Sequence, residues 1–203
     1  MIDFSFLSPV QDRLIDQIEL LHGQAIGKKI VIHTSKSTPD LKGVKIAIIG
    51  VLESRNSVDY IGEEFQITEI RKAFYKLFPG NWLHSMADLG DIQRGNTVED
   101  TYFALSQVVS SLVNANIIPV IIGGSQDLTY ANYRAYDKIS SMVNIVNIDK
   151  SFDLGDSSKP INNGSYLGKI ILEKPYNLFN YTAIGFQTYF NSQEEIDLME
   201  KLY

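Results

Sequence analysis

Acidic and polar residues follow two apolar runs of the chain. The first run leads into IGGSQD, residues 122–127, and the second into DKSFDLGD, residues 149–156. Asp149, Asp153 and Asp156 are the carboxylates of the second segment. Carboxylates gathered at one strand end repel one another, so they need a cation or hydrogen-bond donors nearby. Oxygen ligands of this kind suit magnesium or manganese, although the same aspartates could instead cap turns and helices.

Gly123 and Gly124 suggest a glycine-rich phosphate loop as a second site. The segment lacks the G-x-G-x-x-G spacing of a dinucleotide-binding loop and the lysine of a P-loop. A tight turn between a strand and a helix accounts for both glycines, because glycine adopts backbone conformations that other residues avoid. The turn is therefore favoured over a nucleotide site.

Composition narrows the function classes. The net charge of −6 and the pI near 5.0 argue against a nucleic-acid partner. The absence of cysteine excludes disulfides, thiolate catalysis and thiolate metal sites. The N-terminal residues lack a basic region followed by a long apolar one, and the apolar run 117–122 is too short to cross a bilayer. We expect a cytoplasmic protein with no membrane partner.

Two kinds of segment alternate along the chain, and they must position these residues. Apolar strands are predicted within residues 28–34, 44–51, 85–92, 117–124, 143–149 and 181–186. Amphipathic helices are predicted within 67–77, 97–116, 127–140, 192–203 and, opened by Ser8 and Pro9, 10–23. This alternation predicts a parallel sheet with helices on both faces. Ligands of such sheets lie beyond the carboxyl ends of the strands, where we place Gly123–Asp127, Asp149–Asp156, Glu53, Ser54, Asp88 and Asp91.

Two of the helices have a predicted buried face. In the helix 67–77, helical spacing puts Ile70, Ala73, Phe74 and Leu77 on that face. In the helix 97–116, the buried face runs through Phe103, Val108 and Leu112, with Thr97 and Asp100 as the cap.

The order of these segments resembles the ureohydrolase family of arginase, agmatinase and formimidoylglutamase, over roughly Val44–Phe186. The resemblance implies an arginase/deacetylase-like α/β fold, a three-layer α/β/α sandwich around a mainly parallel sheet. It also implies two manganese ions at the strand ends, which activate a hydroxide that attacks an amidine or guanidine carbon. The family's later D-x-D motif has no match after Asp156. We therefore predict that residues 1–203 form a single ureohydrolase-like domain, the N-terminal portion of a longer parent domain. The surfaces left exposed by the absent C-terminal part would favour a homo-oligomer.

The family motifs GGDHS and DAHxD match this chain in part. Asp149 and Asp153 stand at the two metal-binding aspartates of the second motif, whereas Gln126 and Ser151 stand at the histidines of the two motifs. The remaining differences are Ser125 for aspartate and Lys150 for alanine. The resemblance thus implies residual metal-ligand positions at Asp149 and Asp153, degenerate ones at Gln126 and Ser151, and no catalytic residue or tightly bound cofactor.

Three functions remain open. The first is a non-catalytic binding or assembly domain that takes a small amidine-like ligand. The second is a manganese-dependent hydrolase of C–N bonds in linear amidines, formimidoylglutamase-like or arginase-like, with a centre rebuilt from Asp127, Asp149 and Asp153. The third is a flavodoxin-like domain with an anion at Gly123–Gln126.

The remaining charged and imidazole side chains have simpler expected roles. If the ammonium of Lys150 reached the aspartates, it could replace a cation. We expect surface or core roles for the histidines His22, His33 and His84.

Overall fold

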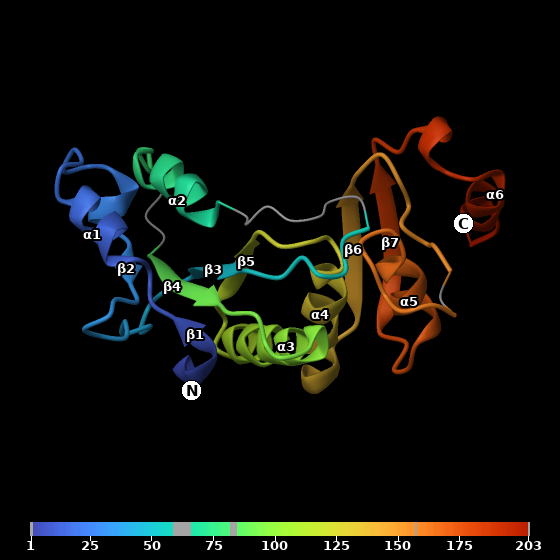
Figure 1. Ribbon diagram of the computed structural model, residues 1–203, viewed down its shortest axis with the longest axis horizontal. Helices are drawn as coiled ribbons and strands as arrows, with labels where there is room; N and C mark the ends of the chain where they lie inside the picture. Colours follow the sequence, from blue (N-terminus) through green and yellow to red (C-terminus); the bar gives the residue numbers. More distant parts are fainter. Residues whose placement is uncertain (1, 59–65, 82–84, 157, 203) are drawn as a thin grey trace. The chain divides into compact units, whose positions relative to one another are not determined.

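The chain forms two compact units, each with a sheet of its own (Figure 1). The computed structural model describes all residues except 1, 59–65, 82–84, 157 and 203. The first unit consists of Met1–Glu53 and Gly62–Gly124, and the second consists of Ser54–Ile61 and Ser125–Tyr203.

The first unit contains a five-stranded, mainly parallel sheet. Its strands are β1 (Leu7–Ser8), β2 (Val31–Ile32), β3 (Ile46–Val51), β4 (Met86–Ile92) and β5 (Ile118–Ile122). The order is β1-β4-β3-β5, and β2 also pairs with β4. Only β1 runs antiparallel to its neighbour within this sheet. The strand β3 lies between two parallel neighbours and is buried from Ala47 to Val51, so its sequence is apolar on both faces.

Helices cover both faces of this sheet, which gives the first unit three layers (Figure 1). α1 (Asp12–Ile18) and α2 (Ile67–Tyr75) share an apolar cluster with Ile48 of β3, and α3 (Val98–Asn114) covers the other face. Short 3-10 helices, η1 and η2, span Phe4–Phe6 and Ile26–Lys28. The α/β class and the parallel sheet are therefore confirmed.

The predicted cap of α3 is confirmed, but one residue of its predicted face is not. The Thr97 hydroxyl accepts a hydrogen bond from the Asp100 N–H (3.2 Å), and the Asp100 carboxylate accepts one from the Thr97 N–H (2.8 Å). Val108 and Leu112 are buried, whereas Phe103 is 55% exposed and meets Phe6 edge-on. The start of the first helix was also misplaced, since Ser8 belongs to β1 and α1 begins at Asp12.

The predicted buried face of α2 is correct only at Phe74, which is partly buried against the core. Ile70 and Leu77 are about half exposed, and the helix buries Ile67, Arg71 and Tyr75 instead. Arg71 is buried because a polar network inside the unit satisfies its guanidinium. A charged residue that pairs in the interior breaks the apolar periodicity from which a helix face is predicted.

That network joins α2 to β4. The Arg71 Nε and Nη2 donate to the two carboxylate oxygens of Asp88 (2.8 and 3.0 Å), while Nη1 donates to Asp91 Oδ1 (2.7 Å). The Tyr75 hydroxyl donates to Asp88 as well (2.8 Å). Burial lowers the pKa of Arg71, but Asp88 and Asp91 outweigh this effect and raise it. Asp88 and Asp91 therefore hold the sheet to a helix, rather than forming the predicted ligand edge.

The second unit is a βαβ arrangement. Its parallel strands are β6 (Val143–Ile148) and β7 (Leu178–Ile184), with α5 (Tyr166–Leu172) between them in the chain. The remaining elements are α4 (Leu128–Arg134), η3 (Ala135–Ile139), η4 (Thr188–Phe190) and α6 (Gln193–Leu202). α5 is the one α-helix of the described chain that the sequence pattern did not predict. Gly168 lies inside this helix, and an interior glycine weakens the sequence signal for a helix.

α5 packs tightly beneath the loop that follows β6. A Cβ on Gly168 would lie 2.1 Å from the backbone oxygen of Leu154, so only glycine permits this approach. The Leu167 N–H donates to the backbone carbonyl oxygen of Asp153 (3.1 Å). The core around these contacts also contains buried side chains from α4, β7 and α6, namely Tyr133, Tyr181 and Met199.

An early segment of the chain completes the second unit. The Val58 N–H donates to the Asn163 side-chain oxygen (2.9 Å). The Asn163 backbone N–H donates to the backbone carbonyl oxygen of Asn56 (3.3 Å). Val58 and Asn163 are 105 positions apart in the sequence.

Candidate functional site

The acidic loop, residues 149–153, follows β6 in the second unit. Asp149 Oδ1 accepts hydrogen bonds from the backbone N–H groups of Lys150 (2.6 Å) and Ser151 (3.5 Å). Its Oδ2 accepts a hydrogen bond from the Gln126 side-chain amide. Both oxygens of this carboxylate therefore have donors from the chain itself.

Asp153 is the buried carboxylate of the loop. It is 6% exposed, its backbone is left-handed with φ at 56°, and the Ser151 hydroxyl donates to its Oδ1 (2.7 Å). Its Oδ2 is buried without a hydrogen-bond partner. Burial raises the pKa of Asp153 to about 6, and repulsion from Asp149 adds to that rise. Asp153 is thus costly to ionise where it lies.

The segment before α4 contributes Gln126. Upstream of it, Gly123 and Gly124 have φ values of 91° and 77°, which confirms that the glycines make a turn. A Cβ on Gly123 would lie 2.9 Å from the Ile67 side chain. Ser125 is buried with no partner for its hydroxyl, and Asp127 is fully buried at the N-cap of α4. Gln126 is the residue of this segment that reaches the acidic loop through its side chain.

Two other predicted acids lie outside the acidic loop. Asp156 is exposed, and the hydroxyl and N–H of Ser158 donate to it (2.6 and 3.0 Å), which lowers its pKa. Its role as a turn cap is the alternative that the sequence left open. Glu53 belongs to the first unit, where the Thr101 hydroxyl donates to it (2.9 Å).

Lys150 does not neutralise the carboxylates. Its ammonium lies 4.4 Å from the centre of the Phe190 ring, and no ion pair joins it to Asp149 or Asp153, all of which are described residues. A cation over an aromatic face is stabilised by the ring quadrupole. The condition under which Lys150 could replace a metal ion, that its ammonium reaches the aspartates, is therefore not met in the structure.

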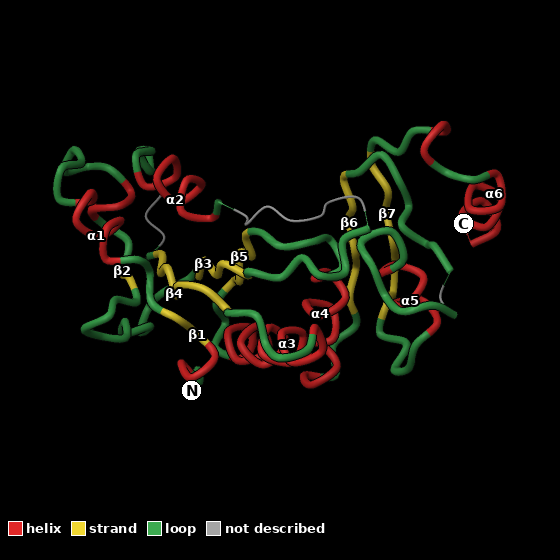
Figure 2. Tube along the Cα trace, in the orientation of Figure 1, coloured by secondary structure: helices red, strands yellow, loops and turns green. Residues whose placement is uncertain are grey.

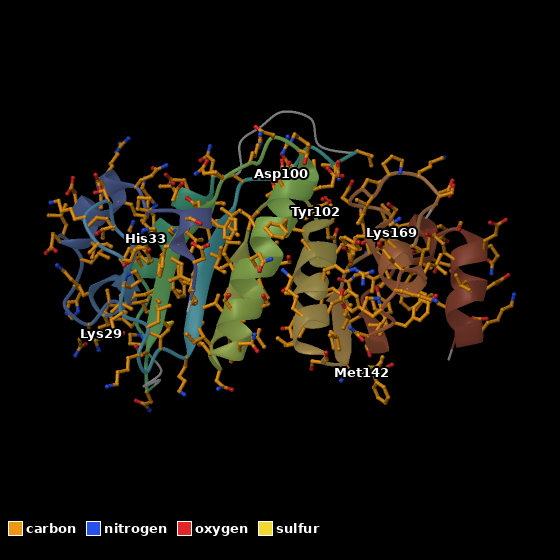
Figure 3. The ribbon with its side chains drawn as sticks, turned by 90° about the horizontal axis from the view of Figure 1, so that it is seen from below. Lys29, His33, Asp100, Tyr102, Met142 and Lys169 are labelled. Carbon is orange, nitrogen blue, oxygen red and sulfur yellow. The ribbon has the colours of Figure 1, made fainter. Side chains whose placement is uncertain are left out.

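Two of the three histidines have the roles expected of them. His33, labelled in Figure 3, is buried with its Nδ1 3.0 Å from the Leu89 backbone oxygen. His22 is exposed. His84 lies outside the described residues. Within the described ranges, no group of three or more His, Cys, Asp or Glu side chains is arranged to hold a metal ion.

Sequence reasoning missed two residues at this site. Tyr166 of α5 is 1% exposed beside Asp153, and burial raises its pKa, with the charge of Asp153 adding to the effect. Asn191 contacts the backbone of the acidic loop from the segment after β7. Tyr166 belongs to the unpredicted helix, and an asparagine after a strand indicates only a turn.

The buried carboxylate predicts how stability depends on pH. The folded pKa of Asp153 lies above its ordinary value of 3.8, so folding favours the protonated form and stability falls as pH rises from about 4 to about 6. Asp153→Asn removes this penalty, and asparagine tolerates the left-handed backbone. We expect the variant to gain about 1–3 kcal/mol at pH 7.5 and much less at pH 4.5, measured by urea unfolding with EDTA present.

Asp156→Asn is the matched control for that experiment. It makes the same chemical change in a neighbouring exposed residue whose pKa is lowered rather than raised, so it should give no gain at pH 7.5. An Asp153→Asn gain of equal size at both pH values would contradict the assignment.

Across the described residues, no helix combines the length and the apolar character needed to span a membrane.

Comparison with known proteins gives a consistent result. The Arginase family model matches residues 44–202. Formimidoylglutamase of Hahella chejuensis is 30% identical over 148 residues, covering 66% of this chain and 44% of the relative. Formimidoylglutamase of Streptococcus gordonii is 28% identical over 181 residues, covering 80% of this chain and 54% of the relative. The chain thus spans about half the length of these curated relatives.

Solved structures share the fold. Trypanosoma cruzi formiminoglutamase with Mn2+2 superposes with a TM-score of 0.73 at 18% identity, covering 87% of this chain and 62% of that one. Formimidoylglutamase from Bacillus subtilis gives 0.69 at 20% identity, covering 81% and 55%. With the family match over most of its length, the parallel sheet and the segment order, the chain belongs to the arginase family.

Proposed function

We propose that this chain is an arginase-family domain with a degenerate metal site, which does not hydrolyse C–N bonds and acts as a binding or assembly domain for a small amidine-like ligand. The observation that supports it most is the hydrogen bond from the Gln126 amide to Asp149. An amide N–H directed at a carboxylate takes up the oxygen lone pair that a cation would use.

The same chemistry recurs at the second carboxylate. The Ser151 hydroxyl donates to Asp153. The two residues that stand at the family's motif histidines, Gln126 and Ser151, therefore both act as hydrogen-bond donors toward aspartates. Histidine would offer a nitrogen lone pair to a metal, whereas these groups offer protons. Two carboxylates and two donors do not fit a two-manganese centre, which needs several anionic or imidazole ligands around each ion.

A manganese-dependent hydrolase is the second candidate. Two observations favour it: the relatives are formimidoylglutamases, and one structural neighbour is described with Mn2+2. Asp127, Asp149 and Asp153 would be its ligands, and the buried Oδ2 of Asp153 has a lone pair to give. The manganese would supply a hydroxide at neutral pH.

Calorimetry with manganese separates the two candidates. We expect no saturable binding at micromolar concentrations by this chain. We also expect no release of urea, ammonia or formamide from arginine, agmatine or formimidoylglutamate, because the ligand set cannot hold the ions that would activate water. Micromolar manganese binding that Asp149→Ala abolishes, together with turnover of any of these substrates, would establish the hydrolase instead.

A further inference from the structure

We propose that Asn191 is a positioning residue that fixes the acidic loop, and with it both aspartates, through a clamp made by residues 185–192. This clamp segment follows β7 and includes η4. Because β6 and β7 run parallel, the acidic loop and the clamp segment leave the same edge of the sheet and lie side by side (Figures 1 and 2).

The Asn191 side chain bonds the loop backbone in both directions. Its Oδ1 accepts a hydrogen bond from the Phe152 N–H (2.8 Å). Its Nδ2 donates to the backbone carbonyl oxygens of Lys150 (3.0 Å) and Gln187 (2.8 Å). The Gln187 N–H also donates to the Lys150 oxygen (2.9 Å). One amide therefore holds the loop at two backbone groups between Asp149 and Asp153.

Side-chain packing supports the same clamp. The Phe152 and Phe186 rings lie 4.8 Å apart, and the Lys150 ammonium lies over the Phe190 ring. Both contacts join the acidic loop to the clamp segment. An asparagine that satisfies backbone groups of two segments constrains their relative position more than an exposed side-chain pair does. The left-handed backbone at Asp153 needs such support, since it is uncommon for a residue other than glycine.

Hydrogen exchange of the native chain tests this role. In Asn191→Ala, we expect exchange at the Phe152 amide and its loop neighbours to accelerate about tenfold or more, while the β7 amides keep their rates. Asn191→Asp keeps the acceptor for the Phe152 N–H but turns a carboxylate oxygen toward the Lys150 and Gln187 carbonyl oxygens, so it should restore only part of the protection at Phe152. Unchanged exchange at Phe152 in Asn191→Ala would overturn the proposal.

Asn177→Ala is the matched control. Asn177 lies in the same unit, and its amide donates to Asp137 (2.8 Å), away from the acidic loop. This variant makes the same truncation, so it should leave the exchange rate at Phe152 unchanged. An equal acceleration in both variants would reduce Asn191 to a general contributor to stability and would refute its positioning role.

A second readout rests on the proposed function. In a Gln126→His, Ser151→His background, Asn191→Ala should weaken manganese affinity about tenfold or more, and Asn177→Ala should not. Equal affinities with and without Asn191 would count against the positioning role. A background that binds no manganese would instead refute the alignment behind the proposed function, and the exchange rates would still decide the role of Asn191.

Discussion

Replacing Arg71 with methionine should lower the free energy of unfolding by about 3–5 kcal/mol, because it leaves two carboxylates in the interior without their cation. Asp88 is fully buried and Asp91 is 8% exposed, and Arg71 donates to both. Urea unfolding followed by circular dichroism measures the loss. Hydrogen exchange at the β4 amides would locate it in the first unit.

Two further variants make this experiment decisive. Lys72→Ala breaks the neighbouring surface pair with Glu69 (2.7 Å), and it should change stability by no more than about 0.5 kcal/mol. Adding Asp88→Asn and Asp91→Asn to Arg71→Met removes the stranded charges, so part of the loss should return. If the single and the triple variants were equally unstable, lost packing rather than the unpaired carboxylates would be the cause.

The double variant Gln126→His, Ser151→His should gain manganese affinity of at least about 100-fold over the native chain. Losing one residue that hydrogen-bonds to a metal ligand typically costs about 10–100-fold in metal affinity. Here two hydrogen-bond donors become imidazoles that bind the metal directly, so the change should be at least as large. Asp149 would lose its bond from Gln126 and have an oxygen available for the ion. Calorimetry with manganese measures the change directly.

The matched comparison uses positions outside the acidic loop. Gln187→His with Ser192→His introduces two imidazoles into the clamp segment, which contributes no carboxylate to the candidate site, and should gain far less affinity. No difference between the two double variants would refute the alignment of Gln126 and Ser151 with the family histidines.

Much of the fold could be predicted from the sequence because apolar strands and amphipathic helices have distinct periods. All six predicted strands are present, and the capping box at Thr97 is confirmed. Pattern reasoning failed at α2 because it treats every charged residue as exposed, and the pairing of Arg71 with Asp88 depends on a segment that is distant in the sequence. It failed at α5 because Gly168 lies inside that helix and weakens the helical signal.

Sequence reasoning named residues of the candidate site but not the contacts between their side chains. Asp149, Asp153, Gln126 and Ser151 all belong to the second unit, and both of the replaced histidine positions contact an aspartate. The sequence held no sign that the two neutral side chains would act as donors, or that Lys150 would turn to an aromatic ring. Such contacts depend on side-chain directions, which segment patterns leave undetermined.

The early segment in the second unit has a consequence for synthesis on the ribosome. Chains emerge from the N-terminal end and domains fold as they emerge. The five strands of the first unit are complete once Ile122 has emerged. Asn56 and Val58, however, cannot form their hydrogen bonds with Asn163 until that residue has emerged as well. For an interval on the order of seconds, residues 54–58 would therefore lack their contacts with Asn163, and a chaperone or a protease could reach this segment before the second unit has folded.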